Sequence, residues 1–262
     1  MLRQRILSAA AGIPLIILAV WHGGIALLLL VAVLMLLGIL EIVGIFERLN
    51  LRPPLWLAML GSLLLLGSAY LYKDEGFAAA ITLVVILFLA VTVLLYPGYT
   101  PVDGAAALLA TLYIGLFAYL YLMRLFDAGW IWLTFTLAGT WASDTLAYFV
   151  GRSLGRHHLA PVLSPGKTVE GAAGGVAGSV LAALVFLYLY PFLPRGPVLL
   201  LGVLLGAAAQ VGDLVESAFK RQAGVKDAGG LIPGHGGILD RFDSMLFTAP
   251  LVYYFVAKFI IS

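Results

Sequence analysis

The chain has no cysteine among its 262 residues, and only 11% of them are charged. The absence of cysteine excludes a disulfide framework, a thiolate nucleophile and a thiolate metal site. Soluble domains carry about 25% charged residues, so this shortage of charge excludes an ordinary water-exposed surface. The net charge of +2 is close to neutral, and we expect no nucleic-acid partner.

Hydrophobic residues make up 63% of the chain, and the mean hydropathy is +1.08. Apolar runs of about twenty residues recur, and each is long enough to cross a hydrocarbon core of about 30 Å. The sequence therefore predicts an all-α polytopic integral membrane protein, surrounded by membrane lipid. Nine spans are expected, at 6–21, 24–44, 55–72, 77–96, 104–123, 129–150, 171–191, 197–218 and 244–261.

We expect residues 1–262 to form a single membrane domain. Helices of residues 1–128 would serve mainly as scaffold, and residues 129–262 would supply the C-terminal helices and the catalytic loops. The apolar stretch after Arg3 and Arg5 lacks an A-x-A-like cleavage site and is expected to remain as the first helix.

Orientation follows from the positions of lysine and arginine, which concentrate on the cytoplasmic side. With nine spans and the N-terminus inside, most of the 15 lysines and arginines fall in cytoplasmic segments. This predicts an N-in, C-out protein of the inner (cytoplasmic) membrane. Both long charged loops, 151–170 and 219–243, then face the cytoplasm. Irregular backbone at membrane depth must be held by protein or a polar cavity, so we expect these loops to form one site.

Several acidic residues lie within or beside expected spans. Asp144 interrupts an apolar run, Asp213 and Glu216 are three residues apart on one helical face, and Asp240 and Asp243 repeat that spacing. A central aspartate costs about 2.5–3.5 kcal/mol in a membrane helix, so such carboxylates are candidates for function.

A structural interpretation of these acids is open as well. Asp213 or Glu216 could form internal ion pairs with Lys220 or Arg221, and Asp240 could pair with its neighbour Arg241. Under this interpretation the acids would stabilise helix packing without taking part in chemistry.

The set as a whole indicates a site for a metal and a phosphate. Clustered carboxylates without cysteine suit a hard cation such as Mg²⁺ better than zinc. Interspersed lysines and arginines would attract phosphate, and glycines between 224 and 237 allow close backbone approach. Together these features are typical of a Mg²⁺–nucleoside triphosphate site.

The segment SPGKT at 164–168 resembles a P-loop but departs from it. Pro161 stands where the pattern requires glycine, and the sequence gives no preceding strand. Lys167 and Thr168 remain candidates for phosphate contact, with helix capping as the alternative for Thr168. His157 and His158 are expected to lie at the membrane–water interface or to face lipid headgroups.

The charged C-terminal pattern resembles the signature of phosphatidate cytidylyltransferases, also called CDP-diacylglycerol synthases. The resemblance is strong over about residues 140–250 and includes the segment 143–171, SDTLAYFVGRSLGRHHLAPVLSPGKTVEG. The signature S-x-x-K-R-x-x-x-x-K-D…P-G-H-G-G-x-x-D-R-x-D is carried by Ser217, Lys220, Arg221, Lys226, Asp227, Pro233, Gly234, His235, Gly236, Gly237, Asp240, Arg241 and Asp243.

The resemblance implies the reaction of CTP with phosphatidic acid, giving CDP-diacylglycerol and pyrophosphate with Mg²⁺ at the cytoplasmic face. The leading metal ligands would be Asp213 and Asp240, followed by Asp243, Asp227 and Asp144. The phosphates of the two substrates would be divided among Lys167, Lys220, Arg221, Lys226 and Arg241, with Thr168, His235, Gly236 and Gly237 as further contacts. Catalysis would rest on Asp213, Lys226, Asp240 and Arg241.

Two other functions are weighed against this one. A CTP-dependent lipid kinase of the polyprenol or phytol type needs a similar nucleotide site but transfers the γ-phosphoryl group to an alcohol. A transporter would distribute its acids through the spans instead of gathering them with basic, glycine-rich loops. The small-residue stretch GAAGGVAGS at 171–179 allows close helix packing within one chain or in a homodimer.

Overall fold

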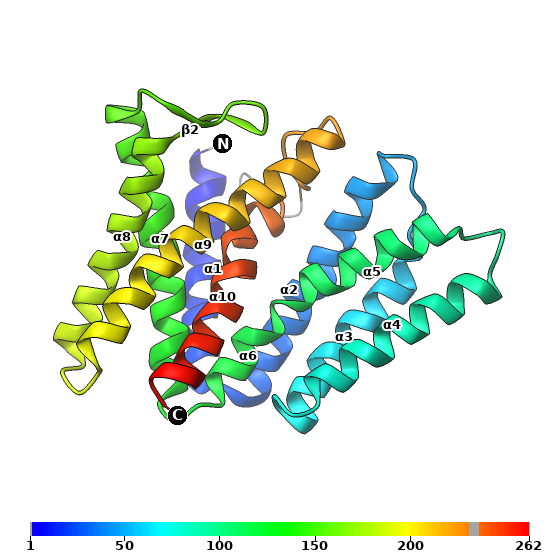
Figure 1. Ribbon diagram of the computed structural model, residues 1–262, viewed down its shortest axis with the longest axis horizontal. Helices are drawn as coiled ribbons and strands as arrows, with labels where there is room; N and C mark the ends of the chain where they lie inside the picture. The colour runs from blue at the N-terminus through cyan, green and yellow to red at the C-terminus, as the bar shows by residue number, and fades with distance from the viewer. Residues whose placement is uncertain (1, 231–235, 262) are drawn as a thin grey trace. The chain divides into compact units, whose positions relative to one another are not determined.

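The computed structural model describes residues 2–230 and 236–261, with side chains from residue 12 onward. Within these residues the chain forms two compact units (Figure 1). Unit 1 contains Met1–Leu125 and Phe219–Arg241, and unit 2 contains Phe126–Ala218 and Phe242–Ser262. The segment 219–241 thus packs with the N-terminal helices, although its neighbours in sequence belong to unit 2.

Unit 1 is built on six helices joined by short connections. They are α1 (Leu2–His22), α2 (Gly24–Glu47), α3 (Leu55–Tyr72), α4 (Phe77–Leu94), α5 (Pro101–Gly115) and α6 (Ala118–Arg124). Helix α3 packs against α2, α4 and α5, and this contact is close because a Cβ at Gly61 would meet Phe88 and Thr111. A capping box of Thr100 and Asp103 starts α5 by satisfying backbone N–H groups that have no partner within the helix.

Unit 2 contains α7 (Gly129–Leu154), a hairpin of β1 (His158–Ala160) and β2 (Ser164–Thr168), and α8 (Val169–Leu189). Most of α9 (Arg195–Gln222) and of α10 (Leu239–Phe259) completes it. Helices α7 and α8 run side by side, as Figure 1 shows. A hydrogen bond of 3.0 Å between the buried hydroxyls of Thr140 and Thr248 joins α7 to α10.

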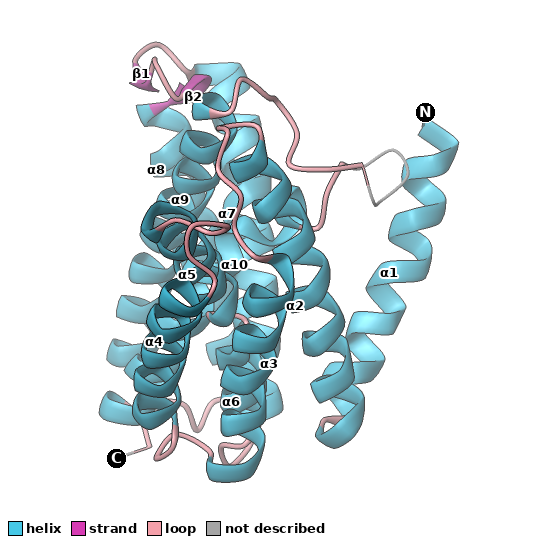
Figure 2. Cartoon of the chain, turned by 90° about the vertical axis from the view of Figure 1, so that its right-hand side faces the viewer, coloured by secondary structure: helices cyan, strands magenta, loops and turns pink. Residues whose placement is uncertain are grey.

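The hairpin is a feature that the sequence pattern did not predict, because the segment 151–170 reads as a loop. Its strands pair antiparallel, with His158 opposite Thr168 and Ala160 opposite Ser164. Figure 2 shows it as the short strands beside the start of α8. Among the described residues it is the exception to an otherwise helical architecture.

Six helical segments are long and apolar enough to cross a membrane: Gly24–Glu47, Leu55–Tyr72, Phe77–Leu94, Pro101–Arg124, Val169–Leu189 and Arg195–Gln222. This confirms the expectation of a helical, multi-pass membrane protein. The other three expected spans coincide with α1, α7 and α10. Helices α7 and α10 carry charged residues of the candidate site, among them Asp144 and Asp243, and these lower the hydropathy by which a span is recognised.

The small residues of α8 are used inside the chain. A Cβ at Gly174 would collide with Val150 of α7, and one at Gly178 would collide with the carbonyl of Ala142. The glycines therefore set the close contact of α7 and α8. This use accounts for the stretch without a second chain.

Candidate functional site

Three carboxylates of unit 2 come together in an acidic cluster, defined here as Asp213, Glu216 and Asp243. One ligand oxygen from each lies within 4.8 Å of the others. Glu216 is 1% exposed and Asp243 is 8% exposed, whereas the Asp213 side chain is 37% exposed. Two of the acids are thus held inside the protein and the third is open to solvent.

The local structure explains why these acids meet. Asp213 and Glu216 are one turn apart on α9 and share a helical face, as their i, i+3 spacing predicts. Asp243 comes from the start of α10, which approaches α9 closely at Gly212. A Cβ at this glycine would lie 2.8 Å from the Asp243 carbonyl oxygen and 3.0 Å from Ser244 Cα. The glycine therefore lets two helices place their carboxylates side by side.

A lysine from the hairpin partly neutralises this cluster. Lys167 Nζ lies 2.7 Å from Asp213 Oδ2, and its side chain is only 18% exposed. The next residue, Thr168, caps α8 by accepting a hydrogen bond of 3.0 Å from the Gly171 N–H. The predicted pair of residues is thus at the site, with Lys167 on a carboxylate and Thr168 in the capping role that was its alternative.

Asp144 lies on α7 near the same group of residues. The hydroxyl of Ser244, the residue after Asp243, donates to Asp144 Oδ1 at 3.4 Å. Asp144 itself is exposed, while Ser244 is 2% exposed. The structure therefore brings together Asp144, Asp213 and Asp243 of the predicted metal ligands, all within unit 2.

Asp240 belongs to unit 1 and has other partners. Lys220 Nζ donates to Asp240 Oδ1 at 2.8 Å, and the side chains of the two residues are 12% and 8% exposed respectively. The Asp240 oxygens also accept from the N–H groups of Ala228, at 3.0 and 3.2 Å, and of Gly237, at 2.8 Å. Asp240 therefore organises the backbone of its own loop, and its role as a metal ligand stays a prediction.

Two ion pairs of these aspartates join residues that are distant in sequence. Asp213 pairs with Lys167 and Asp240 pairs with Lys220, across 46 and 20 residues of sequence, respectively. The structural interpretation of the sequence named pairs between nearer residues. Both aspartates are thus held by a lysine that a local pattern does not identify.

The other described residues of the predicted site belong to unit 1. Lys226, Asp227 and Arg241 are exposed, and the guanidinium of Arg221, also exposed, donates to the Val225 carbonyl at 3.1 Å. Gly236 has a φ of +84°, and a Cβ there would lie 2.7 Å from Asp240 Oδ2. Its neighbour Gly237 donates to the same aspartate. His235 lies outside the described residues.

Two acids of these sites were not among the predicted metal ligands. Glu216 is the most deeply buried member of the acidic cluster, and its i, i+3 spacing from Asp213 was the signal that could have assigned it as a ligand. Glu41 is 5% exposed in α2 and accepts backbone hydrogen bonds from Ile238 and Leu239. Its signal was an acidic residue inside the apolar span 24–44, which the family signature does not include.

The acidic cluster fits a hard divalent cation by the chemistry of its donors. It offers three carboxylate oxygens close to one another, and oxygen donors are what Mg²⁺ prefers. Mg²⁺ keeps several waters or substrate oxygens in its shell, which the partly exposed side of Asp213 would allow.

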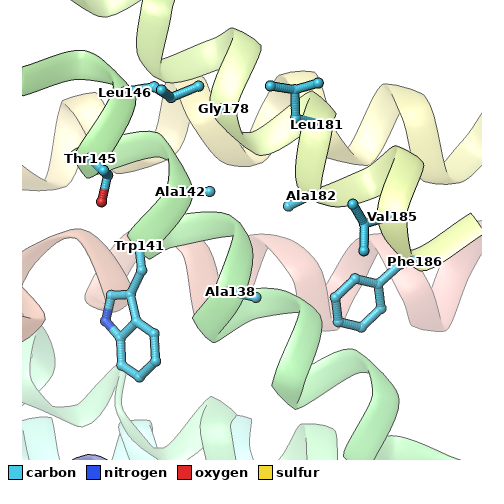
Figure 3. A pocket seen from close by; sticks show the side chains of 10 residues that line it. All are labelled: Ala138, Trp141, Ala142, Thr145, Leu146, Gly178, Leu181, Ala182, Val185 and Phe186. Atoms are coloured by element: carbon cyan, nitrogen blue, oxygen red, sulfur yellow. The ribbon is translucent and has the colours of Figure 1, made fainter. Parts of the chain in front are cut away.

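A groove on the surface of α7 and α8 has a different character. It encloses about 480 Å³ and is lined by Trp141, Leu146, Leu181, Val185 and Phe186, with small residues between them. Figure 3 shows these side chains on the two neighbouring helices. The polar side-chain atoms in the view are the Thr145 hydroxyl oxygen and the Trp141 ring nitrogen. Such a lining suits hydrocarbon and supplies no group for phosphate chemistry.

Comparison with known proteins connects these residues to one family. The sequence profile of the cytidylyltransferase family matches residues 3–259. A protein of Staphylococcus saprophyticus named phosphatidate cytidylyltransferase is 44% identical over 168 residues, which are 63% of this chain and 64% of that protein.

A Bacillus subtilis protein with the same name is 43% identical over 178 residues, or 67% of this chain and 66% of the relative. One of Staphylococcus haemolyticus is 43% identical over 168 residues, covering 63% and 64%. The alignments thus span just under two thirds of the length of these relatives.

Proposed function

The chain belongs to the cytidylyltransferase family, and on this basis we propose that it transfers the cytidylyl group of CTP to phosphatidic acid. The products are CDP-diacylglycerol and pyrophosphate, as the resemblance of the charged signature implies. The observation that carries the proposal is the acidic cluster with Lys167 beside it, in a chain whose relatives bear the name phosphatidate cytidylyltransferase. Unlike a transporter's acids, these carboxylates gather where α9 and α10 meet.

The main requirement of this reaction is to neutralise the negative charge of the two substrates. A phosphate oxygen of phosphatidate attacks the α-phosphorus of CTP, and the bond from that phosphorus to the oxygen bridging to the β-phosphate breaks. The attacking oxygen is already anionic, so no side chain has to remove a proton from it. The protein must instead hold two polyanions together against their mutual repulsion.

Asp213, Glu216 and Asp243 would hold Mg²⁺, with Asp144 beside them. The ion would neutralise phosphate charge and stabilise the charge that develops on the leaving pyrophosphate. The burial of Glu216 and Asp243 fixes their carboxylates in place. Lys167, held by Asp213, presents a cation next to these acids for a substrate phosphate.

Lys226, Arg221 and Arg241 stay the phosphate contacts that the resemblance implies. Their exposed side chains in unit 1 support this role. Lys220 forms an ion pair with Asp240, so its contribution would be to hold Asp240 and the backbone bound to it in place. The exposed N–H groups of a glycine-rich loop are a further means of binding phosphate.

The test uses purified protein in detergent with Mg²⁺, CTP labelled at either the α- or the γ-phosphate, and phosphatidic acid together with a polyprenol. We expect the α-label in the lipid and the γ-label in pyrophosphate. A lipid kinase would instead put the γ-label on an alcohol lipid and leave the α-label in CDP. Label in lipid only from γ-labelled CTP would overturn the proposal in favour of the kinase.

We further propose nine spans with the N-terminus in the cytoplasm, so that both charged segments meet cytoplasmic CTP. The distribution of lysine and arginine supports this orientation. The absence of native cysteine allows single cysteines to be introduced at Gly166 and Gly230, where a Cβ meets no atom within 4 Å, and at the exposed Asp74.

In sealed cells, a membrane-impermeant thiol reagent should label the cysteine at position 74 and leave the other two unlabelled. A permeant reagent should label all three. The reverse pattern would place the nucleotide site on the wrong side of the membrane. A homodimer stays a prediction, to be checked by the mass of the detergent-solubilised protein.

A further inference from the structure

Glu41 is a buried carboxylate in a helix that is otherwise apolar. Helix α2 contains 24 residues, and Glu41 lies near its C-terminal end with 5% of its surface exposed. Burial of a carboxylate is costly unless hydrogen bonds satisfy its oxygens. The partners that satisfy this one therefore indicate why the residue is there.

Those partners come from the opposite end of the sequence. Glu41 Oε1 accepts from the Ile238 N–H at 2.9 Å, and Oε2 accepts from the Leu239 N–H at 2.8 Å. Leu239 begins α10, and the first N–H groups of a helix have no partner within the helix. A carboxylate at this position also complements the positive end of the helix dipole. Glu41 thus caps α10 from a distant helix of the same unit.

The surrounding backbone is shaped to admit this carboxylate. A Cβ at Gly229 would lie 2.7 Å from Glu41 Oε1, and a Cβ at Gly237 would lie 2.5 Å from it. Two parts of the loop therefore approach Glu41 so closely that a side chain at either glycine would displace its carboxylate. At the neighbouring Gly230, by contrast, a Cβ would meet no atom within 4 Å.

The same helix holds the other end of the segment 219–241. The Phe219 ring packs edge-on against Phe46 of α2, with centroids 5.7 Å apart, and against Tyr113 of α5, at 5.5 Å. Helix α2 thus fixes the start of the segment through a ring contact and its end through a carboxylate. Between these two anchors lie Lys226 and the glycine-rich backbone.

The link from Glu41 to the charged residues is short. Glu41 binds the N–H groups of residues 238 and 239, and Asp240 follows directly. Asp240 binds Lys220 and the N–H groups of Ala228 and Gly237. A shift at the start of α10 would therefore move Asp240 and, through it, the loop on which Lys226 stands.

We propose that Glu41 is a positioning residue for the proposed cytidylyl transfer: it fixes the start of α10, and with it Asp240 and residues 226–230, without touching substrate. The expected effect of Glu41 on kcat rests on the proposed function. Its role as the cap of α10 rests on the hydrogen bonds alone.

The first test compares Glu41→Gln with Glu47→Gln, an exposed glutamate at the end of the same helix. A glutamine keeps one acceptor oxygen but turns an N–H₂ group towards the second backbone donor. We expect kcat of the Glu41 variant to fall about tenfold or more, with the KM values for both substrates changing less. Glu47→Gln should match the wild type.

Hydrogen exchange supplies a readout that needs no turnover. The amides of Ile238 and Leu239 should exchange faster in Glu41→Gln than in Glu47→Gln, while those in the middle of α10 keep their protection. Unchanged exchange at 238 and 239 would overturn the capping role. An inactive wild type would refute the proposed function and leave this structural result standing.

A second pair of variants tests the close approach. Gly229→Ala should reduce kcat in the manner of Glu41→Gln because its methyl group displaces the carboxylate. Gly44→Ala, in helix α2 where an added Cβ meets no atom within 4 Å, should be neutral. Adding Glu41→Ala to Gly229→Ala should cost less than the two separate losses predict, since the collision is gone. Additive losses of kcat would show that Gly229 does not act through Glu41, and would overturn the proposal. A fall in melting temperature with unchanged kcat would assign Glu41 to stability alone.

Discussion

Two lysine–aspartate pairs in the described part of the chain have nearly equal distances but different surroundings. Lys167 and Asp213 are 2.7 Å apart in unit 2, and Lys220 and Asp240 are 2.8 Å apart in unit 1. The Asp213 side chain is 37% exposed and has two further carboxylates within 4.8 Å. The Asp240 side chain is 8% exposed and accepts from two backbone N–H groups in addition to its lysine.

The difference separates a binding arrangement from a structural one. Like charges held close together favour the binding of a cation, because it relieves their repulsion. A carboxylate whose oxygens are occupied by a lysine and by N–H groups is instead stabilised as it stands, and it fixes the backbone around it. Ion-pair distance alone would not have distinguished the two.

The largest effect is expected for Asp213→Asn. Removing one carboxylate from the acidic cluster weakens the proposed Mg²⁺ site, whose stabilisation of phosphate charge amounts to several kcal/mol. We expect kcat to fall about 10³-fold, with a higher Mg²⁺ concentration needed for the residual activity. Initial rates over a Mg²⁺ titration measure both quantities.

The melting temperature in detergent is the control for this variant. The change relieves like-charge repulsion but also removes the partner of the largely buried Lys167 ammonium, so the two effects oppose each other and only a small change in melting temperature is expected. Asp243→Asn, at the buried side of the cluster, should show the same shift in Mg²⁺ dependence. Wild-type Mg²⁺ dependence in both variants would remove the cluster from the metal site.

A smaller effect is expected for Lys226→Ala, which changes an exposed side chain in unit 1. Its contribution to stability as a surface charge is at most about 1 kcal/mol. On a transferring or leaving phosphate, however, a preorganised charge is worth about 10²-fold in rate. We expect kcat/KM to fall by that factor with an unchanged melting temperature.

Lys73→Ala is the matched control for Lys226, since both are exposed lysines and Lys73 follows the end of α3. It should keep wild-type kinetics. A mild defect in Lys226→Ala, or a large loss of thermal stability accompanying it, would make this lysine part of the architecture of its loop.

Asp240→Asn is expected to lower stability more than activity, in contrast to the two preceding variants. The change leaves the Lys220 ammonium largely buried without its carboxylate, which costs about 3 kcal/mol. We expect a clear fall in melting temperature and only about a tenfold fall in kcat, through disorder of the loop. A 10³-fold loss of kcat with an intact melting temperature would show that Asp240 binds the metal as originally predicted.

The sequence alone identified the helical architecture and most of the charged residues of the candidate site. Hydropathy predicted helices at each of the expected spans, and the i, i+3 spacing placed Asp213 and Glu216 on one face of α9. These are local properties, so they can be read from neighbouring residues. The N-cap role of Thr168 was also available as an alternative from its position before an apolar run.

What escaped prediction depends on contacts between distant residues. Glu41 and Leu239 are joined by a hydrogen bond across 198 residues, and Lys167 reaches Asp213 from another element. No spacing rule links such pairs. The role of Gly212 could not be predicted either, because the sequence does not show which element packs against a glycine in a helix. The hairpin was missed because its short strands contain Pro165 and Gly166, residues that normally argue against a strand.

The smallest effect is expected at Thr168, the residue after Lys167. Its hydroxyl oxygen accepts the Gly171 N–H at the start of α8, and replacing a threonine cap by alanine costs about 1 kcal/mol. Thr168→Ala should therefore lower thermal stability slightly and reduce kcat/KM by only about threefold, through a small displacement of the neighbouring lysine. Thr168→Ser keeps the hydroxyl and should restore both quantities. If Thr168→Ala instead lost about 10²-fold in kcat/KM with no change in melting temperature, the hydroxyl would be donating to a substrate phosphate, and unit 2 would bind phosphate through the hairpin as well as through its metal.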